Sequence, residues 1–423
     1  MAGKNRSASN SLVIKAQNMR VLLLALLRQQ PISRIRLARA TNLSTTTVTT
    51  LVAELLEQGV ICEAGTDLEA ATAGAGRPPL ALRLRPESRC ALGIHIGVRR
   101  VRVALVDLQA NILDHEVYDI TPDEPAEHAI ARAGDLGAAI LARHHALSQQ
   151  GALVGIGVGA SGLVENQSGT NILAPNLGWR NVPLRRILSE RFVLPVVVDN
   201  NVRCMALAES LYGVGRNARA LAYVYARIGV GAGIVVDGEI YRGADYGAGE
   251  IGHWVMTPNS GDLCRCGNRG CLETLISESV LMERAHAIDP ELITDRPNAL
   301  AMVFAAARDG HLSLVEMLEE RAYYVGIALA NLVNVINPQL IMLGGWLYDA
   351  FDLIEPVIER TMRRHAFGGL GNRVDILPTS FGAYSGVIGA GVLALENFFY
   401  TPGSAAAQRA GSKTGRMTQG TTP

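Results

Sequence analysis

The first part of the chain alternates short periodic apolar segments with turns. Residues 12–30 have the apolar spacing of a helix that Pro31 ends, and residues 33–40 predict a short second helix. Residues 41–43 form a turn, and Ser44 is a typical N-cap for a third helix. In that helix, apolar residues recur at positions 48, 51, 52, 55 and 56, which is the spacing of one buried face. This order of elements predicts a helix-turn-helix.

Two short strands follow the third helix. Residues 60–62 and 80–84 are apolar and flank a Gly/Ala-rich loop, which is the outline of a winged helix. The polar residues 1–11 are expected to lack a fixed structure.

From residue 90 onward, apolar runs alternate with helical periodicity, which predicts an α/β body. The strands expected in its first half are residues 90–106 (two strands joined by a turn), 111–120, 152–159 and 192–198, and the helices are 124–150 and 202–212. In the second half the strands are 221–226, 230–236, 239–241, 340–343 and 373–378, and the helices are 277–288, 298–309, 312–335, 350–365 and 385–397. Residues 401–423 are rich in Gly, Ser, Thr and Ala and are expected to be disordered.

Composition and charge add a candidate partner. A chain of 423 residues with 48% apolar residues has room for more than one domain. Its formal net charge is zero, but the distribution is uneven, because no acidic residue precedes Glu54. The basic residues of that segment are Lys4, Arg6, Lys15, Arg20, Arg28, Arg34, Arg36 and Arg39. A basic module on a neutral body indicates nucleic-acid binding, and the alternative is a solvated basic arm.

A run of threonines opens the third helix and would lie on or near its outer face. Hydroxyl groups suit phosphates and base edges, and threonine methyls suit thymine methyls. The alternative is a packing helix, but threonine is a poor helix former, so DNA contact would explain the run. The residues expected to contact DNA are Arg34, Ser44, Thr45, Thr46, Thr47 and Thr49, together with Arg77 of the wing loop, which could enter a minor groove.

Other features argue for a cytoplasmic protein. The apolar run at residues 21–27 is too short to span a membrane, and it lacks the small-residue cleavage site of a signal peptide. Six cysteines, three of them in one loop, argue against a disulfide scaffold.

That loop, within residues 249–273, combines a histidine with three cysteines. Its candidate metal ligands are His253, Cys264, Cys266 and Cys271. Imidazole and thiolates are the ligands of a tetrahedral Zn²⁺ site, and four protein ligands predict a structural ion. Gly267 and Gly270 allow the loop to turn back tightly. The alternative is three reduced thiols beside a core histidine.

The same stretch carries a family resemblance. The pattern GE-x-GH followed by C-x-CG-x2-GCLE resembles the ROK family of sugar kinases and sugar-responsive repressors, over about residues 91–397. The resemblance implies an actin-like ATPase (ribonuclease H-like) body of two lobes. The expected division is a winged helix-turn-helix domain at 1–85, a first lobe at 86–200, a second lobe at 201–398 whose last helix packs back on the first, and a tail at 399–423.

The resemblance also implies a sugar site. Glu250, His253 and Glu273 would contact sugar hydroxyls, with His253 also binding zinc. Gly162 would lie in a turn beside the sugar. Asn176, Asn200 and Asn201 would complete the site. Capping of the following helix is the alternative role of the last two asparagines, and both roles are compatible.

Three positions depart from the kinase branch of the family. A sugar kinase needs a carboxylate base, and Asn201 stands where the kinases have aspartate. The first phosphate turn, Asp-x-Gly-x-Thr in kinases, reads from His95 to Arg99 as HIGVR. The second phosphate turn reads Gly-Thr-Gly in the kinases, whereas the corresponding segment of this chain begins with Arg227. No ATP binding and no kinase activity are therefore expected.

The favoured interpretation is a sugar-responsive transcriptional regulator. It would be a repressor that binds operator DNA as a homodimer or homotetramer and is released by a sugar or sugar-phosphate effector. The alternative is an ATP-dependent sugar kinase with an added N-terminal module. A third hypothesis gives the body a protein or sugar-phosphate partner, because Arg99, Arg100 and Arg227 could bind a phosphate.

Overall fold

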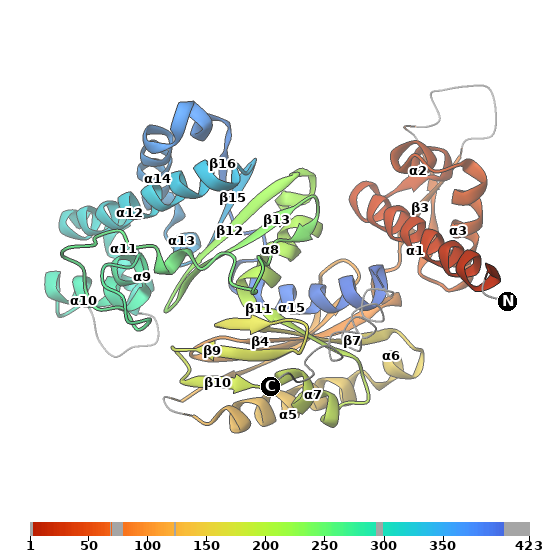
Figure 1. Ribbon diagram of the computed structural model, residues 1–423, viewed down its shortest axis with the longest axis horizontal. Coiled ribbons are helices and arrows are strands. Elements are labelled where there is room, and N and C mark those ends of the chain that lie inside the picture. Colours follow the sequence, from red (N-terminus) through yellow and green to blue (C-terminus); the bar gives the residue numbers. More distant parts are fainter. Residues whose placement is uncertain (1–2, 68, 70–78, 122–123, 293–298, 402–423) are drawn as a thin grey trace, which may run out of the picture.

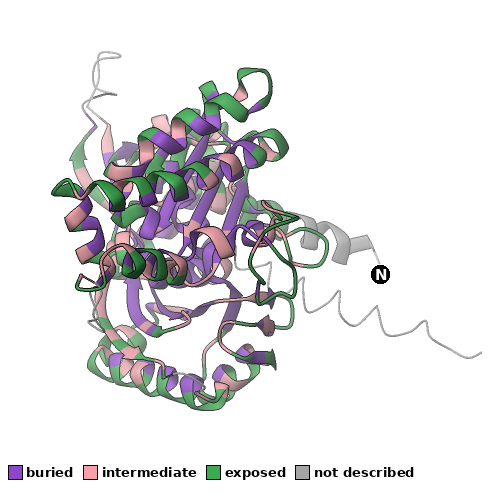
Figure 2. Cartoon of the chain, turned by 90° about the vertical axis from the view of Figure 1, so that its left-hand side faces the viewer, coloured by how far each residue is buried: buried purple, intermediate pink, exposed green. Residues whose placement is uncertain are grey.

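The computed structural model describes residues 3–67, 69, 79–121, 124–292 and 299–401. A small N-terminal head, drawn in red in Figure 1, lies beside a larger body of two lobes. Buried residues follow the sheets and the inner helices, and the outer helices carry the exposed ones (Figure 2). Within the described ranges, no helix combines the length and apolar character needed to cross a membrane.

In its described residues, the head combines three helices with a small sheet. Its helices are α1 (Gly3–Gln29), α2 (Arg34–Thr41) and α3 (Thr45–Glu57). Its antiparallel sheet has the order β1-β3-β2, with β1 (Ile32–Ser33), β3 (Leu80–Leu84) and β2 (Ile61–Thr66). Helix α1 begins at Gly3, so the expectation that residues 3–11 lack structure was wrong. Asn42 has a left-handed φ of 55°, which ends α2 and turns the chain toward α3.

The first lobe is built on a five-stranded sheet of order β11-β7-β4-β5-β6. Its strands are β4 (Cys90–Ile96), β5 (Arg100–Asp107), β6 (Ile112–Asp119), β7 (Leu153–Ala160) and β11 (Val196–Asn200). The predicted helix at 124–150 is divided at His144 into α5 (Ala126–Arg143) and α6 (His145–Gln149).

The first lobe also has elements that periodicity did not predict, because they are short and the strands are separated by turns that contain glycine. They are a three-stranded sheet of β8 (Leu163–Glu165), β9 (Thr170–Ala174) and β10 (Trp179–Val182), and helix α7 (Leu184–Arg191).

The second lobe has a five-stranded sheet of order β14-β13-β12-β15-β16. Its strands are β12 (Ala220–Ala226), β13 (Val230–Val236), β14 (Glu239–Ile240), β15 (Leu340–Gly345) and β16 (Asp375–Pro378). Its helices are α9 (Glu273–Ile276), α10 (Glu278–Ile288), α11 (Ala299–Arg308), α12 (Leu312–Ile336), α13 (Trp346–Asp349) and α14 (Phe351–His365). Short helical turns are η1 (Pro86–Ser88), η2 (Val214–Asn217), η3 (Ile251–His253), η4 (Phe367–Arg373) and η5 (Gly382–Tyr384).

The two large sheets share one topology. In each, three consecutive antiparallel strands are followed by two strands that run parallel to the first. The chain therefore folds the same strand order twice. This repeat is the arrangement expected of an actin-like body.

Two fully buried helices lie between the lobes, α8 (Asn201–Leu211) and α15 (Ser385–Leu395) (Figure 1). A π-helical turn, η6 (Glu396–Tyr400), continues α15. Helix α15 packs directly on the first-lobe sheet, because glycines leave no side chain in the way. A Cβ atom on Gly157 would lie 1.8 Å from the Ala390 carbonyl oxygen, and one on Gly93 would lie 2.4 Å from that of Val387.

Candidate functional site

The four predicted metal ligands come together at one point. The ligand atoms of His253, Cys264, Cys266 and Cys271 all lie within 4.8 Å of one another, so the cluster could hold a metal ion. His253 Nδ1 is 3.7 Å from Cys264 Sγ, and Cys266 Sγ is 3.7 Å from Cys271 Sγ. A tetrahedral ion with bonds of about 2.3 Å holds its sulfur ligands about 3.8 Å apart. The spacing therefore fits such an ion.

The glycines of the loop are required by its path. Gly267 and Gly270 have φ of 95° and 70°, in the left-handed region that favours glycine. A Cβ atom on Gly270 would lie 2.2 Å from the Thr257 carbonyl oxygen. Burial raises the pKa of Cys271 to about 12. This thiol therefore keeps its proton until a cation displaces it.

Two carboxylates flank the metal cluster. Glu273 lies two residues after Cys271 and is buried, and its Oε2 accepts a hydrogen bond of 3.0 Å from the Val230 amide. Glu250 lies three residues before His253, and burial raises its pKa, with Glu273 adding to the effect. Carboxylate oxygens each accept hydroxyl hydrogen bonds, so this acidic pair is chemically suited to a polyhydroxylated ligand.

The first lobe contributes Asn176 to the same region. Asn176 lies between β9 and β10, and its Oδ1 accepts a hydrogen bond from Arg265 of the metal loop. A Cβ atom on Gly229 would lie 3.5 Å from Asn176 Nδ2 and 3.6 Å from Glu273 Oε2. Groups from both lobes therefore meet around Gly229. The sequence motifs did not predict that Arg265 joins the two lobes.

The start of α8 holds the other asparagines. Asn200 Oδ1 accepts from the amides of Val202 and Arg203 at 2.8 and 3.2 Å, so Asn200 caps the helix. Its Nδ2 donates to the Gly162 carbonyl at 2.9 Å, which joins two of the predicted sugar-site residues. The capping role that the sequence left open is thus present.

Asn201 reaches toward the first-lobe sheet. Its Nδ2 lies 3.3 Å from Ser161 Oγ and 3.4 Å from His95 Nε2. Burial lowers the pKa of His95 to about 3, with a smaller contribution from Arg102. The ring is therefore neutral near pH 7, and Nε2 can accept the hydrogen bond.

A buried charge cluster lies beside these asparagines. Asp199 accepts hydrogen bonds from Arg203 Nη1 at 3.1 Å and from Arg242 Nε at 2.8 Å. Arg203 also donates to the Tyr246 carbonyl. The i,i+4 spacing of Asp199 and Arg203 was the available sequence signal for their pairing. Both Asp199 oxygens are held by cations, and its side chain is not exposed.

Ion pairs occupy the region of the two altered phosphate turns. Arg227 binds Glu278 at 3.3 Å and Asp349 at 2.7 Å, and Arg99 of the first lobe reaches the same Glu278 at 3.4 Å. Arg100 pairs with Asp119. The three arginines that suggested a phosphate ligand therefore already have carboxylate partners.

The predicted DNA-contacting residues lie on and around α3. Thr45, Thr46 and Thr49 are exposed, whereas Thr47 is half-buried. Ser44 Oγ accepts from the Thr47 amide at 3.1 Å and lies 2.8 Å from the Thr47 hydroxyl, so Thr47 belongs to the helix cap. Arg34 lies 3.9 Å from Glu63. Arg77 lies outside the described residues.

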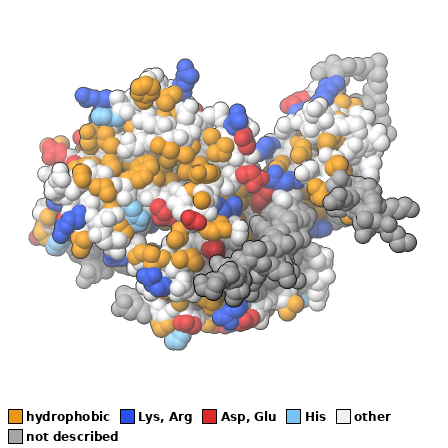
Figure 3. Space-filling model, viewed as in Figure 1, with side chains coloured by type: hydrophobic (Ala, Val, Ile, Leu, Met, Phe, Trp, Pro, Cys, Tyr) orange, Lys and Arg blue, Asp and Glu red, His pale blue; other side chains and the backbone are white. Residues whose placement is uncertain are grey.

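Much of the basic charge of the head is paired within the molecule. Ion pairs join Lys15 to Glu54 and Arg36 to Asp67 and Glu69, while Arg20 binds carboxylates of the body. Figure 3 shows Lys and Arg side chains gathered with acidic ones where the head meets the body. The count of basic residues therefore overstates the charge that remains for DNA.

The N-cap of α3 allows a direct stability test. Replacing Ser44 by alanine removes the acceptor of the Thr47 amide, and loss of a cap typically costs about 1 kcal/mol. We expect the Ser44→Ala variant to lose about that much unfolding free energy in urea titrations of the head transition. Thr46→Ala, which removes an exposed hydroxyl outside the cap, is the control. A Ser44→Ala variant as stable as the unmodified protein would show that the cap contributes nothing.

Comparisons with known proteins agree with this architecture. Residues 91–397 match the ROK family, and residues 17–61 match a winged helix-turn-helix DNA-binding family. A xylose repressor of Caldicellulosiruptor bescii is 32% identical over 343 residues, which are 79% of this chain and 84% of that protein.

Solved structures extend the similarity to three dimensions. A ROK family transcriptional regulator, described as a homolog of the Escherichia coli MLC protein, covers 93% of this chain and 98% of its own, with a TM-score of 0.76 and 26% identity. A ROK family glucokinase from Streptomyces griseus, solved with glucose and AMPPNP, covers 73% of this chain and 100% of its own, with a TM-score of 0.62 and 28% identity. The regulator thus spans more of the chain than the kinase does. This chain belongs to the ROK family, with a winged helix-turn-helix DNA-binding segment ahead of its ROK body.

Proposed function

We propose that the protein is a sugar-responsive transcriptional repressor of carbohydrate uptake or catabolism genes. The observation that carries this proposal is the joining, in one chain, of a winged helix-turn-helix to a two-lobe ROK body. Relatives that match 79% and 91% of the chain are named xylose repressors. The working division is a DNA-binding head at 1–85, lobes at 86–200 and 201–398, and a tail at 399–423.

The effector would be a sugar bound between the lobes. Glu250, Glu273 and His253 Nε2 are its proposed hydroxyl partners from the second lobe. On the first-lobe side the partners are Asn176, Asn200, Asn201 and the turn at Gly162. The proximity of Asn176 and Glu273 to Gly229 supports a ligand that touches both lobes. Asn200 would contribute through Nδ2, because its Oδ1 caps α8.

The metal is proposed to be a structural Zn²⁺. His253, Cys264, Cys266 and Cys271 would hold it, and four protein ligands leave no open position for catalysis. The ion would fix the loop that carries Arg265 and leads into Glu273. It would therefore support the sugar site without taking part in a reaction.

We propose that the protein is not a kinase. Asn201 is an amide and cannot act as the base that takes the proton of an attacking hydroxyl. The neighbouring carboxylate, Asp199, is held by Arg203 and Arg242. Arg227 is paired with Glu278 and Asp349 where a phosphate turn would be needed. The alternative, an ATP-dependent sugar kinase with an added head, is supported by the glucokinase relatives, which match 72% and 73% of this chain.

The repressor would work by a shift between two populations. Two or more copies would hold their α3 helices at the spacing of two operator half-sites. Thr45, Thr46 and Thr49 would face the DNA, with Arg34 and Arg77 at its edges. Sugar binding would favour a different arrangement of the lobes, move the heads out of register and weaken operator binding. By reciprocity, operator DNA would weaken sugar binding by the same factor.

An operator-binding assay tests this function. DNA from upstream of the protein's own gene is titrated with the protein in the presence of xylose, glucose and their phosphates, and ATP turnover is measured in parallel. The expected result is specific DNA binding that one sugar releases, without ATP consumption. Sugar-dependent ATP consumption without DNA binding would instead establish the kinase alternative.

A further inference from the structure

One side chain of the head contacts both lobes of the body. Arg20 of α1 donates to Glu396 Oε1 through Nε at 3.1 Å and through Nη2 at 2.7 Å. Its Nη2 also donates to Glu239 Oε1 at 3.0 Å. Glu239 belongs to β14, at the edge of the second-lobe sheet, whereas Glu396 follows α15, which packs on the first-lobe sheet. A single guanidinium therefore joins three parts of the molecule.

This contact is partly shielded from water. The Arg20 side chain is 25% exposed and that of Glu396 is 13% exposed. Arg20 Nε–H is shared between Glu396 Oε1 and Thr401 Oγ1, which accepts it at 2.9 Å. A planar guanidinium that makes several charge-assisted hydrogen bonds is sensitive to the relative position of its acceptors. Arg20 can therefore keep both carboxylates only while the lobes hold this arrangement.

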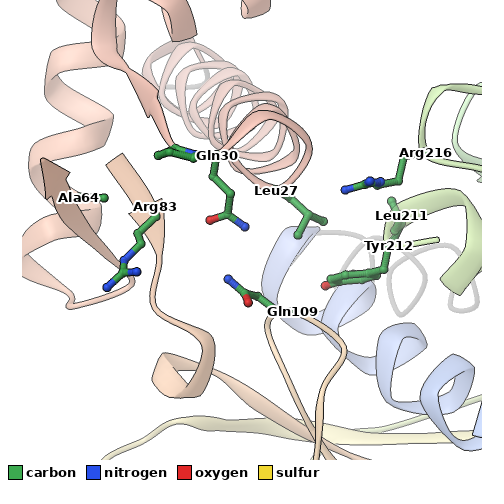
Figure 4. A pocket seen from close by; sticks show the side chains of 9 residues that line it. Leu27, Gln30, Ala64, Arg83, Gln109, Leu211, Tyr212 and Arg216 are labelled. Carbon is green, nitrogen blue, oxygen red and sulfur yellow. The ribbon is translucent and has the colours of Figure 1, made fainter. Parts of the chain in front are cut away.

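Apolar residues of α1 such as Leu23 and Leu27 share a buried cluster with residues of the body, but the packing of the head on the body is interrupted at one place. A cavity of about 430 Å³ lies between the two parts. Figure 4 shows Gln30 and Arg83 of the head on one side of it, and Gln109, Tyr212 and Arg216 of the body on the other. An interface with such a gap gains less from apolar burial. The orientation of the head then depends more strongly on polar contacts such as those of Arg20.

Helix α8 connects this interface to the candidate sugar site. Its first residue is Asn201, and its last, Leu211, borders the cavity. All eleven residues of α8 are buried, and the helix is about 16 Å long. The next residue, Tyr212, lies with its hydroxyl 3.1 Å from that of Tyr400 in η6, the turn that begins with Glu396. Helix α8 and the Tyr212–Tyr400 contact therefore link the sugar end to the turn that binds Arg20.

We propose that Arg20 is the positioning residue that couples sugar binding to DNA binding. With both carboxylates bound, the guanidinium holds the head in one orientation relative to the lobes. The two ion pairs of Arg20, with Glu239 and with Glu396, form what we call the clamp. Lobe movement on sugar binding changes the separation of the two carboxylates and breaks one of these ion pairs. The head is then no longer held in that orientation. This inference rests on the proposed repressor function.

The test compares the full-length protein with its Arg20→Met variant, which keeps an apolar stem but loses the fork. The measured quantity is the ratio of operator Kd values with and without sugar, by fluorescence anisotropy, together with sugar affinity in the absence of DNA, by calorimetry. Allosteric ratios are typically about 5 to 150, and we expect Arg20→Met to lower the ratio to about 2 or less. Sugar affinity without DNA should stay the same or rise, because the variant has no ion pair that sugar binding must break.

Three further variants serve as a control and as partial disruptions of the Arg20 ion pairs. Arg28→Met, on the same helix, is the matched control, because Arg28 has no carboxylate partner in the described part of the chain. Glu239→Gln removes only the second-lobe arm at an exposed position, so it should fold normally and lower the ratio in part. Arg20→Lys keeps the charge without the fork and should give an intermediate ratio.

The outcomes separate the two proposals. If the unmodified protein shows no sugar effect on operator binding, the repressor function itself fails. If the unmodified protein responds and both Arg20→Met and Glu239→Gln respond equally well, the clamp is overturned and the function stands. Should Arg20→Met fail to fold, the test rests on the ratio of operator Kd values with and without sugar in Glu239→Gln. A ratio equal to that of the unmodified protein overturns the clamp, and a lower ratio supports it.

Discussion

Replacing Cys266 by serine is expected to remove the metal and abolish the sugar response. Even the loss of an outer partner of a metal ligand lowers metal affinity by about 10- to 100-fold, so loss of a thiolate ligand should lower it by more than about 100-fold. Cys266 is exposed, so the substitution leaves no cavity in the core. Any effect on the sugar site would therefore come from the loop.

The physical path from the metal to the sugar site is short. Without the ion, the loop loses the cross-link that holds Cys264, Cys266 and Cys271 against His253. Glu273, two residues after Cys271, would then lose its fixed position beside Val230. Arg265 would lose its contact with Asn176 of the first lobe. The second-lobe and the first-lobe sides of the site are thus weakened together.

Metal content and sugar response are measured on the same preparations. Zinc by mass spectrometry should be about one per chain in the unmodified protein and close to none in Cys266→Ser. Sugar should no longer release the operator from the variant. Cys62→Ser, which changes a half-buried cysteine of the wing, is the control and should retain both properties. A Cys266→Ser protein that keeps its zinc and its full response would contradict the proposed role of the loop.

Replacing Gly229 by valine is expected to produce a repressor that sugar no longer releases. A Cβ atom at this position lies 3.5 Å from Asn176 Nδ2 and 3.6 Å from Glu273 Oε2, so a branched side chain would fill the space between them. The backbone of Gly229 is outside the left-handed region, so valine causes no backbone strain. We expect sugar affinity to fall about 100-fold, equivalent to about 2.7 kcal/mol, with operator affinity unchanged.

Two smaller substitutions calibrate this result. Gly229→Ala adds a methyl group at ordinary contact distance and should weaken sugar binding only slightly. Gly231→Ala, two residues along the chain, adds the same group 3.8 Å from its nearest atoms and is the matched control. Calorimetric titration gives the sugar affinities, and anisotropy gives the operator affinities. Wild-type sugar affinity in Gly229→Val would mean that the sugar binds elsewhere.

Sequence patterns predicted much of this fold. The helices of the head, the strands and helices of the two large sheets and the composition of the metal cluster all follow from local signals. Ser44 illustrates why: its cap depends on the amide of Thr47, only three residues away. Short elements without a clear period, such as β8 to β10 and α7, were not predicted, because their pairing depends on neighbours in space.

The candidate site was predicted only in part. Motifs identified Asn176, Glu250 and Glu273, but not Arg265, which joins the metal loop to Asn176 across 89 positions of sequence. Basic residues near the N-terminus indicated a nucleic-acid partner. Several of them are instead neutralised by carboxylates, among them Glu239 and Glu396, which lie more than 200 residues away from Arg20.

The sequence by itself determined the family, the order of the elements and the residue types available to a metal and a sugar. These properties depend on local spacing, such as helical periodicity or the positions of three cysteines in eight residues. Only the tertiary structure decided which charges are already paired, that Asn200 Nδ2 binds the Gly162 carbonyl, and that Arg20 contacts both lobes. Such contacts form between residues that the packing of α8 and α15 brings together, and no periodicity along the chain records that packing.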